Sequence, residues 1–195
     1  MSKPASNLDI DNRQQANQRE QEGRPPVLRE RPREASHSAA HMPTAKTVAE
    51  SQVVMAAMMQ PPDANTWGNV HGGAILRMVD EAGGAVAIRH SRCPSVTVAM
   101  DSMTFKEPVY VGDLLTVRAC LTYVGRTSME VEAQIEAEDM RTGEIRHAGT
   151  CYLVYVAIDD LGHPTPVPAL TIATDEERAR WQAAERRRAY RSGQA

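Results

Sequence analysis

The segment from Pro62 to Gly84 combines a carboxylate with a helix start that favours negative charge. Asp80 and its neighbour Glu81 interrupt an otherwise apolar run. A carboxylate on an apolar face is costly to bury without a partner, so such groups concentrate where chemistry occurs. Gly72 and Gly73 stand at the expected helix start, where backbone N–H groups lack partners and the helix dipole favours negative charge. An acid–base group and an anion-stabilising end in one short element suit acyl transfer.

Each of these residues also has a simpler interpretation. Asp80 fits a general base or a nucleophile, but equally an acid on a helix surface. Asn65 follows the Pro61-Pro62-Asp63 run, where Asn is a common turn residue. Gly72 and Gly73 fit a helix entry that needs small residues. We expect Glu81, one position round the helix, to be solvated or structural.

Sequence motifs for metal or nucleotide chemistry are lacking. His37 and His41 have a spacing that a helix could use for metal binding, but they lie in a Ser/Ala-rich segment without a third ligand. We therefore expect both to be solvated. The chain shows no Ser nucleophile elbow, Walker loop or zinc-ligand pattern. The expected chemistry needs neither metal nor cofactor.

The charge distribution argues against a nucleic-acid partner. Residues 46–170 carry nine basic and fifteen acidic side chains, a net charge of −6, whereas nucleic-acid scaffolds usually present a basic face. The sequence has no run of 18 apolar residues and no apolar signal-peptide core, so we expect no membrane span. Cys93, Cys120 and Cys151 are odd in number and widely spaced, which favours free thiols in a reducing compartment. We expect a cytoplasmic protein.

Three regions follow from composition and hydrophobic periodicity. Residues 1–45 are polar and lack an apolar period, so we expect a disordered tail. Residues 46–170 predict one domain with a strand, a long helix and four further strands, and residues 171–195 predict a charged helix and tail. The last three strands are joined by short turns and predict an antiparallel meander. The expected strands span about 50–59, 96–105, 113–124, 127–138 and 145–158, and the expected helices span 71–90 and 174–191.

Residue types within these elements predict how they pack. The first helix is rich in small residues between positions 82 and 87, which indicates close approach of another backbone, as when a sheet wraps around the helix. In the strand over 127–138, acidic and amide side chains alternate with apolar ones and predict one face in water. In the last helix, Thr174 and Glu177 form a capping-box pattern, Trp181 is the expected anchor, and Arg186 to Arg188 are expected to be solvated.

Several separated motifs, in the right order, resemble one known family. They are N-x-x-G-N-V-H-G-G over 65–73, M-V-D-E-A-G-G over 78–84, D-x-M-x-F over 101–105, V-G-D over 111–113 and G-R-T-S-M-E-V over 125–131. Together they resemble acyl-CoA thioesterases with the hotdog fold, specifically the cytosolic acyl-CoA hydrolase group. The resemblance covers about residues 53–190 and leaves the first forty-odd residues outside.

The resemblance implies an α+β hotdog fold, in which a five-stranded antiparallel sheet wraps around a central helix, with a C-terminal helix added. It implies an acyl-CoA substrate, a role in fatty acid metabolism, and a homodimer with a continuous sheet. Such dimers often assemble further into hexamers, as trimers of dimers. Because this chain carries one such domain, the second half of each active site is expected from another copy.

The resemblance also assigns roles to particular residues. Asp80 is expected to act as general base or nucleophile. Asn65 of the neighbouring subunit is expected to orient water or substrate through its amide, and Asn69 in the same loop remains an alternative. Gly72 and Gly73 are expected to donate backbone N–H groups to the oxyanion. His71 is expected to be mainly structural, although it could act as a base.

The turn residues Arg126, Thr127 and Ser128 are expected near the CoA, with Arg126 able to reach a phosphate. An ordinary β-turn with a solvated Arg explains the same residues. Two rival functions also remain. A non-hydrolytic module would bind acyl-CoA without turnover, and a hydratase would usually need an Asp-His pair in the helix region. No His follows Asp80 until His90, which weighs against the hydratase.

Overall fold

The structure of the chain, a computed structural model, describes residues 44–193. Its elements run in the order β1 (Lys46–Thr47), α2 (Val48–Ser51), β2 (Val53–Met58), the 3-10 turn η1 (Pro61–Asp63), α3 (Gly72–Ser91), β3 (Ser95–Phe105), β4 (Asp113–Val124), β5 (Ser128–Asp139), β6 (Ile145–Ala157), β7 (Leu170–Thr171) and α4 (Asp175–Arg191). Residues 1–43, which make up most of the predicted tail and include His37 and His41, lie outside the described range.

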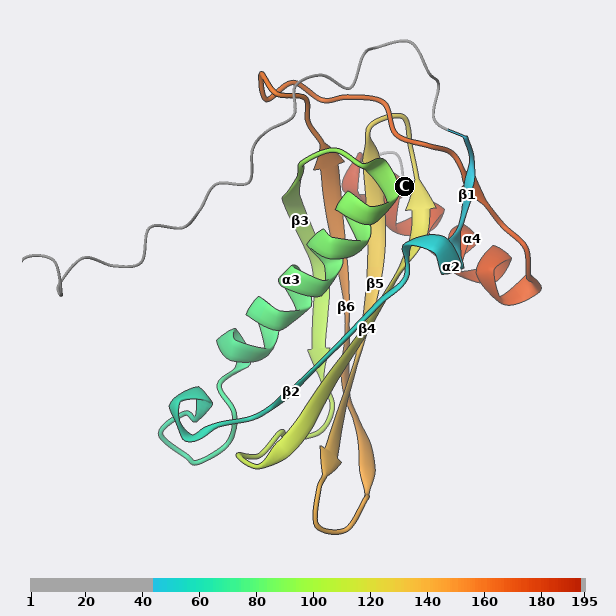
Figure 1. The fold of residues 1–195 in the computed structure, drawn as a ribbon. Coiled ribbons are helices and arrows are strands. Elements are labelled where there is room, and N and C mark those ends of the chain that lie inside the picture. Colours follow the sequence, from blue (N-terminus) through green and yellow to red (C-terminus); the bar gives the residue numbers. More distant parts are fainter. Residues whose placement is uncertain (1–43, 194–195) are drawn as a thin grey trace, which may run out of the picture. The chain divides into compact units, whose positions relative to one another are not determined.

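Five strands form one antiparallel sheet in the order β2-β4-β5-β6-β3, and α3 lies across one of its faces (Figure 1). The last three long strands are neighbours in sequence and in the sheet, which confirms the predicted meander. β3 follows α3 in the chain and pairs with β6 alone within the sheet, so it forms one edge. The α+β fold with a sheet around a central helix is confirmed.

The core lies between α3 and the sheet. Residues spaced three and four apart turn one stripe of the helix inward, where Ile75, Val79, Ala82 and Val86 are buried. Burial of one Val or Ile side chain contributes about 1.5–3 kcal/mol relative to exposure, so this stripe fixes the helix on the sheet. The helix ends at Ser91, and the next residue, Arg92, stops it with a left-handed backbone conformation, φ 60°.

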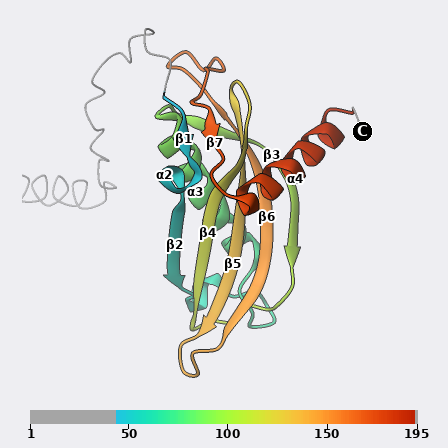
Figure 2. The ribbon, with the colours of Figure 1, turned by 90° about the vertical axis from the view of Figure 1, so that its right-hand side faces the viewer.

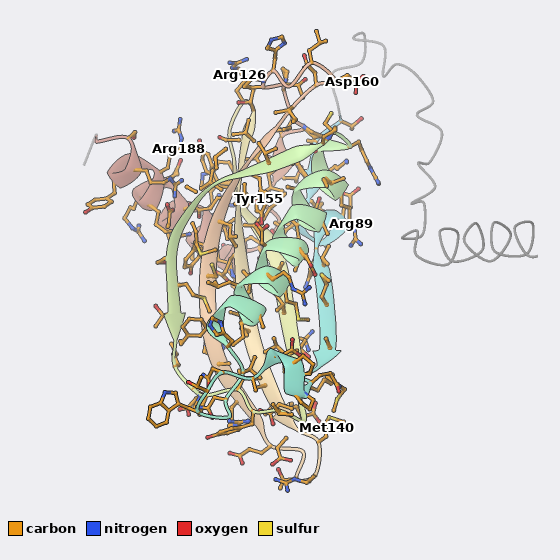
Figure 3. All side chains as sticks on the ribbon, turned by 90° about the vertical axis from the view of Figure 1, so that its left-hand side faces the viewer. Arg89, Arg126, Met140, Tyr155, Asp160 and Arg188 are labelled. Atoms are coloured by element: carbon orange, nitrogen blue, oxygen red, sulfur yellow. The ribbon has the colours of Figure 1, made fainter. Side chains whose placement is uncertain are left out.

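The close approach to the small residues of α3 comes from a side chain. A methyl group added at Gly83 would overlap the hydroxyl oxygen of Tyr155 and lie 3.0 Å from its ring carbon Cζ. Tyr155 projects from β6, and Figure 3 shows it between the helix and the sheet. Gly83 therefore admits an aromatic ring under the helix, where the sequence indicated a neighbouring backbone.

α4 crosses the outer face of the sheet (Figure 2). Thr174 and Glu177 cap its N-terminus reciprocally, and the Trp181 ring packs against Tyr123 in a tilted arrangement with a centroid distance of 4.5 Å. Both the predicted capping box and the predicted anchor are confirmed.

The prediction of a water-facing side on β5 is wrong for two of its acids. Glu130 is 1% exposed and Glu132 is 6% exposed, because α4 covers them. The prediction that Arg186 to Arg188 are all solvated is wrong for Arg187, which donates to the Glu130 carboxylate at 2.7 Å and lies over the Tyr152 ring. Strand alternation could not reveal that a distant helix supplies cations to this face.

The prediction of a strand over about 50–59 is wrong at its beginning. Residues 48–51 form α2, and the strand β2 starts only at Val53. Thr47 precedes the helix, and the Glu50 carboxylate accepts from the Thr47 backbone N–H at 2.7 Å. Thr and Glu three residues apart are a capping signal, which favours the helical turn. Among the described residues, no helix is both long and apolar enough to span a membrane.

Candidate active site

Asp80 stands on the exposed side of α3 with one carboxylate oxygen held in place. Oδ1 accepts hydrogen bonds from the Thr97 hydroxyl at 2.6 Å and from the Tyr155 hydroxyl at 3.1 Å. Oδ2 has no hydrogen bond within residues 44–193. A carboxylate with one oxygen fixed and the other free is arranged to accept a proton or to attack an electrophile.

The charge of Asp80 also acts on the sheet beneath the helix. Cys151 on β6 is fully buried, and burial together with the nearby Asp80 carboxylate raises the pKa of its thiol to about 11. The same two causes, burial first and the Asp80 carboxylate second, raise the pKa of Tyr155 above its ordinary value. Tyr155 therefore remains a hydrogen-bond donor, and the Cys151 thiol is not a nucleophile near neutral pH.

Asn65 begins the loop that leads into α3. Its Oδ1 accepts from the backbone N–H of Trp67 at 2.8 Å and of Asn69 at 3.3 Å. The side-chain oxygen thus holds the loop together, while the amide nitrogen has no partner in the described part of the chain. Asn65, Asn69, Gly72 and Phe105 line a cavity of about 400 Å³ at the helix start.

The two glycines at the start of α3 differ in what their N–H groups contact. The Gly73 N–H donates to Nδ1 of His71 at 2.9 Å, so His71 caps the helix. The Gly72 N–H finds no acceptor among the described residues. A methyl group at Gly72 would lie 3.2 Å from Cζ of Phe105, so this backbone is open only because the residue is small. Gly72 is the better placed donor to a ligand.

The acid and the helix start are far apart within one chain. Asp80 follows Gly72 by eight residues, and a rise of 1.5 Å per residue separates them by about 12 Å along the helix. One thioester carbonyl cannot contact both groups of a single chain. The structure therefore brings together Asn65, Asn69 and Gly72, and separately Asp80 with Thr97 and Tyr155.

The turn over 126–128 lies at the other end of the molecule from the Asn65 loop. The loop pairs beside the start of β4 through Asn69 and Tyr110, whereas Arg126 follows the end of that strand. Twelve residues of strand span roughly 35–40 Å. In Figure 3, Arg126 marks this far end and Met140 marks the opposite one.

Sequence reasoning missed Thr97 and Tyr155, the two hydroxyl donors to Asp80. Thr97 belongs to an alternating strand and Tyr155 to an aromatic-rich one, so neither pattern singled them out. The register of β3 against β6 brings them together, because Thr97 pairs with Tyr155 across the two strands. Pairing between non-consecutive strands is not visible in the sequence.

Comparison with known proteins identifies the family. The thioesterase superfamily pattern matches residues 68–144. Protein VdlD of Helicobacter pylori is 35% identical over 159 residues, which cover 82% of this chain and 91% of that protein. The chain belongs to the thioesterase superfamily. Together with the relatives and solved structures described next, this confirms the resemblance to hotdog acyl-CoA thioesterases.

Other relatives of this thioesterase carry more specific names. The uncharacterized acyl-CoA thioester hydrolase YkhA of Bacillus subtilis is 36% identical over 135 residues, covering 69% of this chain and 78% of that protein. The cytosolic acyl coenzyme A thioester hydrolase of Rattus norvegicus is 30% identical over 142 residues, and the match covers 72% of this chain and 37% of the rat protein.

Solved structures share the fold. An apo-hexameric acyl-CoA thioesterase is 33% identical with a TM-score of 0.74, covering 77% of this chain and 96% of that one. An acyl-CoA hydrolase of Staphylococcus aureus, solved with butyryl coenzyme A and coenzyme A, is 32% identical with a TM-score of 0.71, covering 76% and 91% of the two chains.

Proposed function

We propose that the protein hydrolyses the thioester of acyl-CoA to free CoA and a carboxylic acid. The observation that carries this proposal is the Asp80 carboxylate, fixed through Oδ1 by two hydroxyl groups and open at Oδ2. Relatives named as acyl-CoA thioester hydrolases and a neighbour solved with butyryl coenzyme A support the substrate class. The cytoplasm and fatty acid metabolism are the setting that we infer for this reaction.

Solved variants of the S. aureus hydrolase support the choice of residues. Those variants replace with alanine an Asn, an Asp 15 positions later, and a Thr a further 17 positions on. Asn65, Asp80 and Thr97 of this chain have the same two spacings, 15 and 17. We infer that these three residues form the corresponding group here.

The active site is shared between two copies of the chain. One chain alone separates Gly72 from Asp80 by about 12 Å, and β3 presents an unpaired edge with Val96, Val98 and Met100 exposed. An apolar strand edge of this length invites pairing with another strand. Two-fold pairing along β3 reverses the second copy, so its Asp80 approaches the Asn65 loop of the first. Hexameric neighbours support a trimer of such dimers.

In the proposed reaction, Oδ2 of Asp80 takes a proton from water as the water oxygen attacks the thioester carbonyl carbon. The Gly72 N–H and the Asn65 amide N–H₂ donate to the developing oxyanion, where one such donor supplies about 2.7–4 kcal/mol. The carbonyl reforms as the C–S bond breaks, and the sulfur leaves as the CoA thiol with the proton. In the nucleophilic alternative, Oδ2 attacks the same carbon and the CoA sulfur leaves as the thiolate, and water then hydrolyses the mixed anhydride to the carboxylic acid and free Asp80.

His71 caps α3, because its Nδ1 accepts the hydrogen bond from the Gly73 N–H. The Gly73 N–H can serve as a second oxyanion donor only if this hydrogen bond to His71 breaks. The turn residues Arg126, Thr127 and Ser128 remain proposed CoA contacts. In the reversed second copy, the turn over 126–128 lies toward the end of the first copy that carries Asn65. At one shared site, the second copy therefore supplies both Asp80 and the turn, and the first copy supplies Asn65.

The test is thiol release from acyl-CoAs of increasing chain length, measured for wild type, Asp80→Asn and Asn65→Ala. Hydrolysis by wild type and strong loss in both variants are expected. Full activity of Asp80→Asn rejects the assignment of Asp80. Binding of acyl-CoA without thiol release indicates the non-hydrolytic module, and a change in enoyl-CoA absorbance without thiol release indicates a hydratase.

A further inference from the structure

The Tyr155 hydroxyl is tied to the helix at Asp80 alone. It lies 3.1 Å from the Asp80 carbonyl oxygen and 3.1 Å from Oδ1 of the same residue. The side chain is 1% exposed and rises from β6 into the core, where Figure 3 shows it beneath α3. A phenol carries one proton, so the two oxygens share a single donor. This contact links backbone and carboxylate of one residue.

The Tyr155 ring reaches Asp80 because one residue of α3, Gly83, has no side chain. Gly83 leaves the space that the hydroxyl and the ring edge occupy, and any larger residue would overlap them. A buried phenol that lacked a partner would cost free energy, so the hydroxyl and its acceptors are fixed together. Because the ring is packed on all sides, its oxygen is a rigid reference point for the carboxylate.

The second donor to Asp80 is the Thr97 hydroxyl, which lies 2.6 Å from the same Oδ1. Thr97 belongs to β3, and Tyr155 belongs to the neighbouring strand β6. Two adjacent strands therefore hold Oδ1, and Tyr155 is the donor whose ring is fully buried.

We propose that Tyr155 is a positioning residue of the hydrolase, which fixes Oδ1 of Asp80 so that Oδ2 faces water and the thioester. The inference rests on the proposed function of Asp80. Tyr155 contacts no substrate in this account and acts only through the carboxylate. Preorganised groups of this kind lower the barrier because they need no reorientation during the reaction.

Tyr155→Phe tests the inference, because it removes one oxygen and retains the ring. We expect kcat to fall about tenfold, the size of one hydrogen bond to a charged group, with KM nearly unchanged. A fall in kcat at an unchanged KM distinguishes loss of positioning at Asp80 from loss of substrate binding.

The matched control is Tyr152→Phe on the same strand. Its hydroxyl donates to Glu132 at 3.0 Å on the outer face of the sheet, away from α3. Equal kcat and KM for Tyr152→Phe and wild type are expected. The thermal unfolding midpoint of each variant, measured beside the rates, shows that the compared proteins are folded at the assay temperature.

The outcomes separate this inference from the function on which it rests. Wild-type kcat in Tyr155→Phe, combined with strong loss in Asp80→Asn, overturns the positioning role alone. Full activity of Asp80→Asn overturns the catalytic role of Asp80 and the inference with it. Loss of kcat at an unchanged KM in Tyr155→Phe, but not in Tyr152→Phe, together with strong loss in Asp80→Asn, supports both.

Discussion

Gly83 of α3 and Tyr155 of β6 fit together as a space and its occupant. The hydroxyl and the ring carbon Cζ of Tyr155 fill the volume that a methyl group at Gly83 would need, with Cζ 3.0 Å from that position. The next residue differs, because a methyl group at Gly84 would meet only the ring carbon Cε1 of Tyr155, at 3.9 Å. The packing therefore requires glycine at position 83, whereas position 84 has room for a methyl group.

The first prediction compares these two glycines. Gly83→Ala is expected to destabilise the fold by about 1–3 kcal/mol, because a well-packed core must shift to admit the methyl group. Gly84→Ala is the control, and it is expected to be neutral or to stabilise by up to about 1 kcal/mol through helix propensity. Urea unfolding measures both. Equal stability of the two variants would contradict the packing described for Tyr155.

The same pair shows how far the sequence could predict this fold. The small residues of the helix indicated that something approaches closely, and the periodicity of Ile75, Val79, Ala82 and Val86 indicated which face is buried. The identity of the close neighbour depends on β6, more than sixty residues later in the chain. Local pattern determines that a contact exists, and only the strand order determines with what.

The candidate site was likewise predictable only in its local part. The residues from Asn65 to Asp80 lie in one continuous segment, so the sequence shows their spacing, which matched that of a family. Thr97 and Tyr155 join Asp80 only because β3 pairs with β6 out of sequence order. The burial of Glu130 depends on α4, so alternation along β5 predicted water where the structure has Arg187.

The second prediction distinguishes the role of the Asn65 side-chain oxygen from that of its side-chain nitrogen. Asn65→Asp keeps an oxygen that can accept from Trp67 and Asn69 but removes the N–H₂ donor. We expect kcat to fall at least tenfold with little change in thermal stability. Asn65→Ala is expected to lose both activity and loop order. If Asn65→Asp retains wild-type kcat, the amide nitrogen does not serve the oxyanion.

The third prediction concerns acid stability and His90. This imidazole is fully buried at the end of α3, with Nε2 2.9 Å from the Pro168 carbonyl oxygen and Nδ1 3.0 Å from the Ser51 hydroxyl. Burial lowers the pKa of His90 below its ordinary value. The unfolded chain then binds a proton that the folded chain does not, so stability falls as pH drops below about 6.5, by up to about 1.4 kcal/mol per pH unit.

Urea unfolding between pH 7 and pH 5 measures this effect. His90→Gln is expected to flatten the dependence of the unfolding free energy on pH. The exposed His147 is the control position, and His147→Gln should retain the wild-type slope. An unchanged slope in His90→Gln would assign the acid sensitivity to other groups.

The fourth prediction compares two acids on the outer face of β5. Glu130 is buried and accepts from Arg187 at 2.7 Å and Arg191 at 3.0 Å. Glu130→Gln is expected to cost about 2 kcal/mol, because it removes the buried charge that the partly buried Arg187 and Arg191 contact, although Asp101 still pairs with Arg191. Glu136 pairs with the half-exposed Arg118, so Glu136→Gln is expected to cost less than about 1 kcal/mol. Similar costs in the two variants would contradict the docking of α4 through Glu130.

The shared site is tested most directly by mixing two inactive chains. Asn65→Ala and Asp80→Asn are each expected to be inactive, but a mixed dimer contains one site with an intact Asn65 from one chain and an intact Asp80 from the other. With equal amounts and random pairing, half of the dimers are mixed and about a quarter of wild-type thiol release should return. No recovery in dimers shown to be mixed would contradict a site built from two copies.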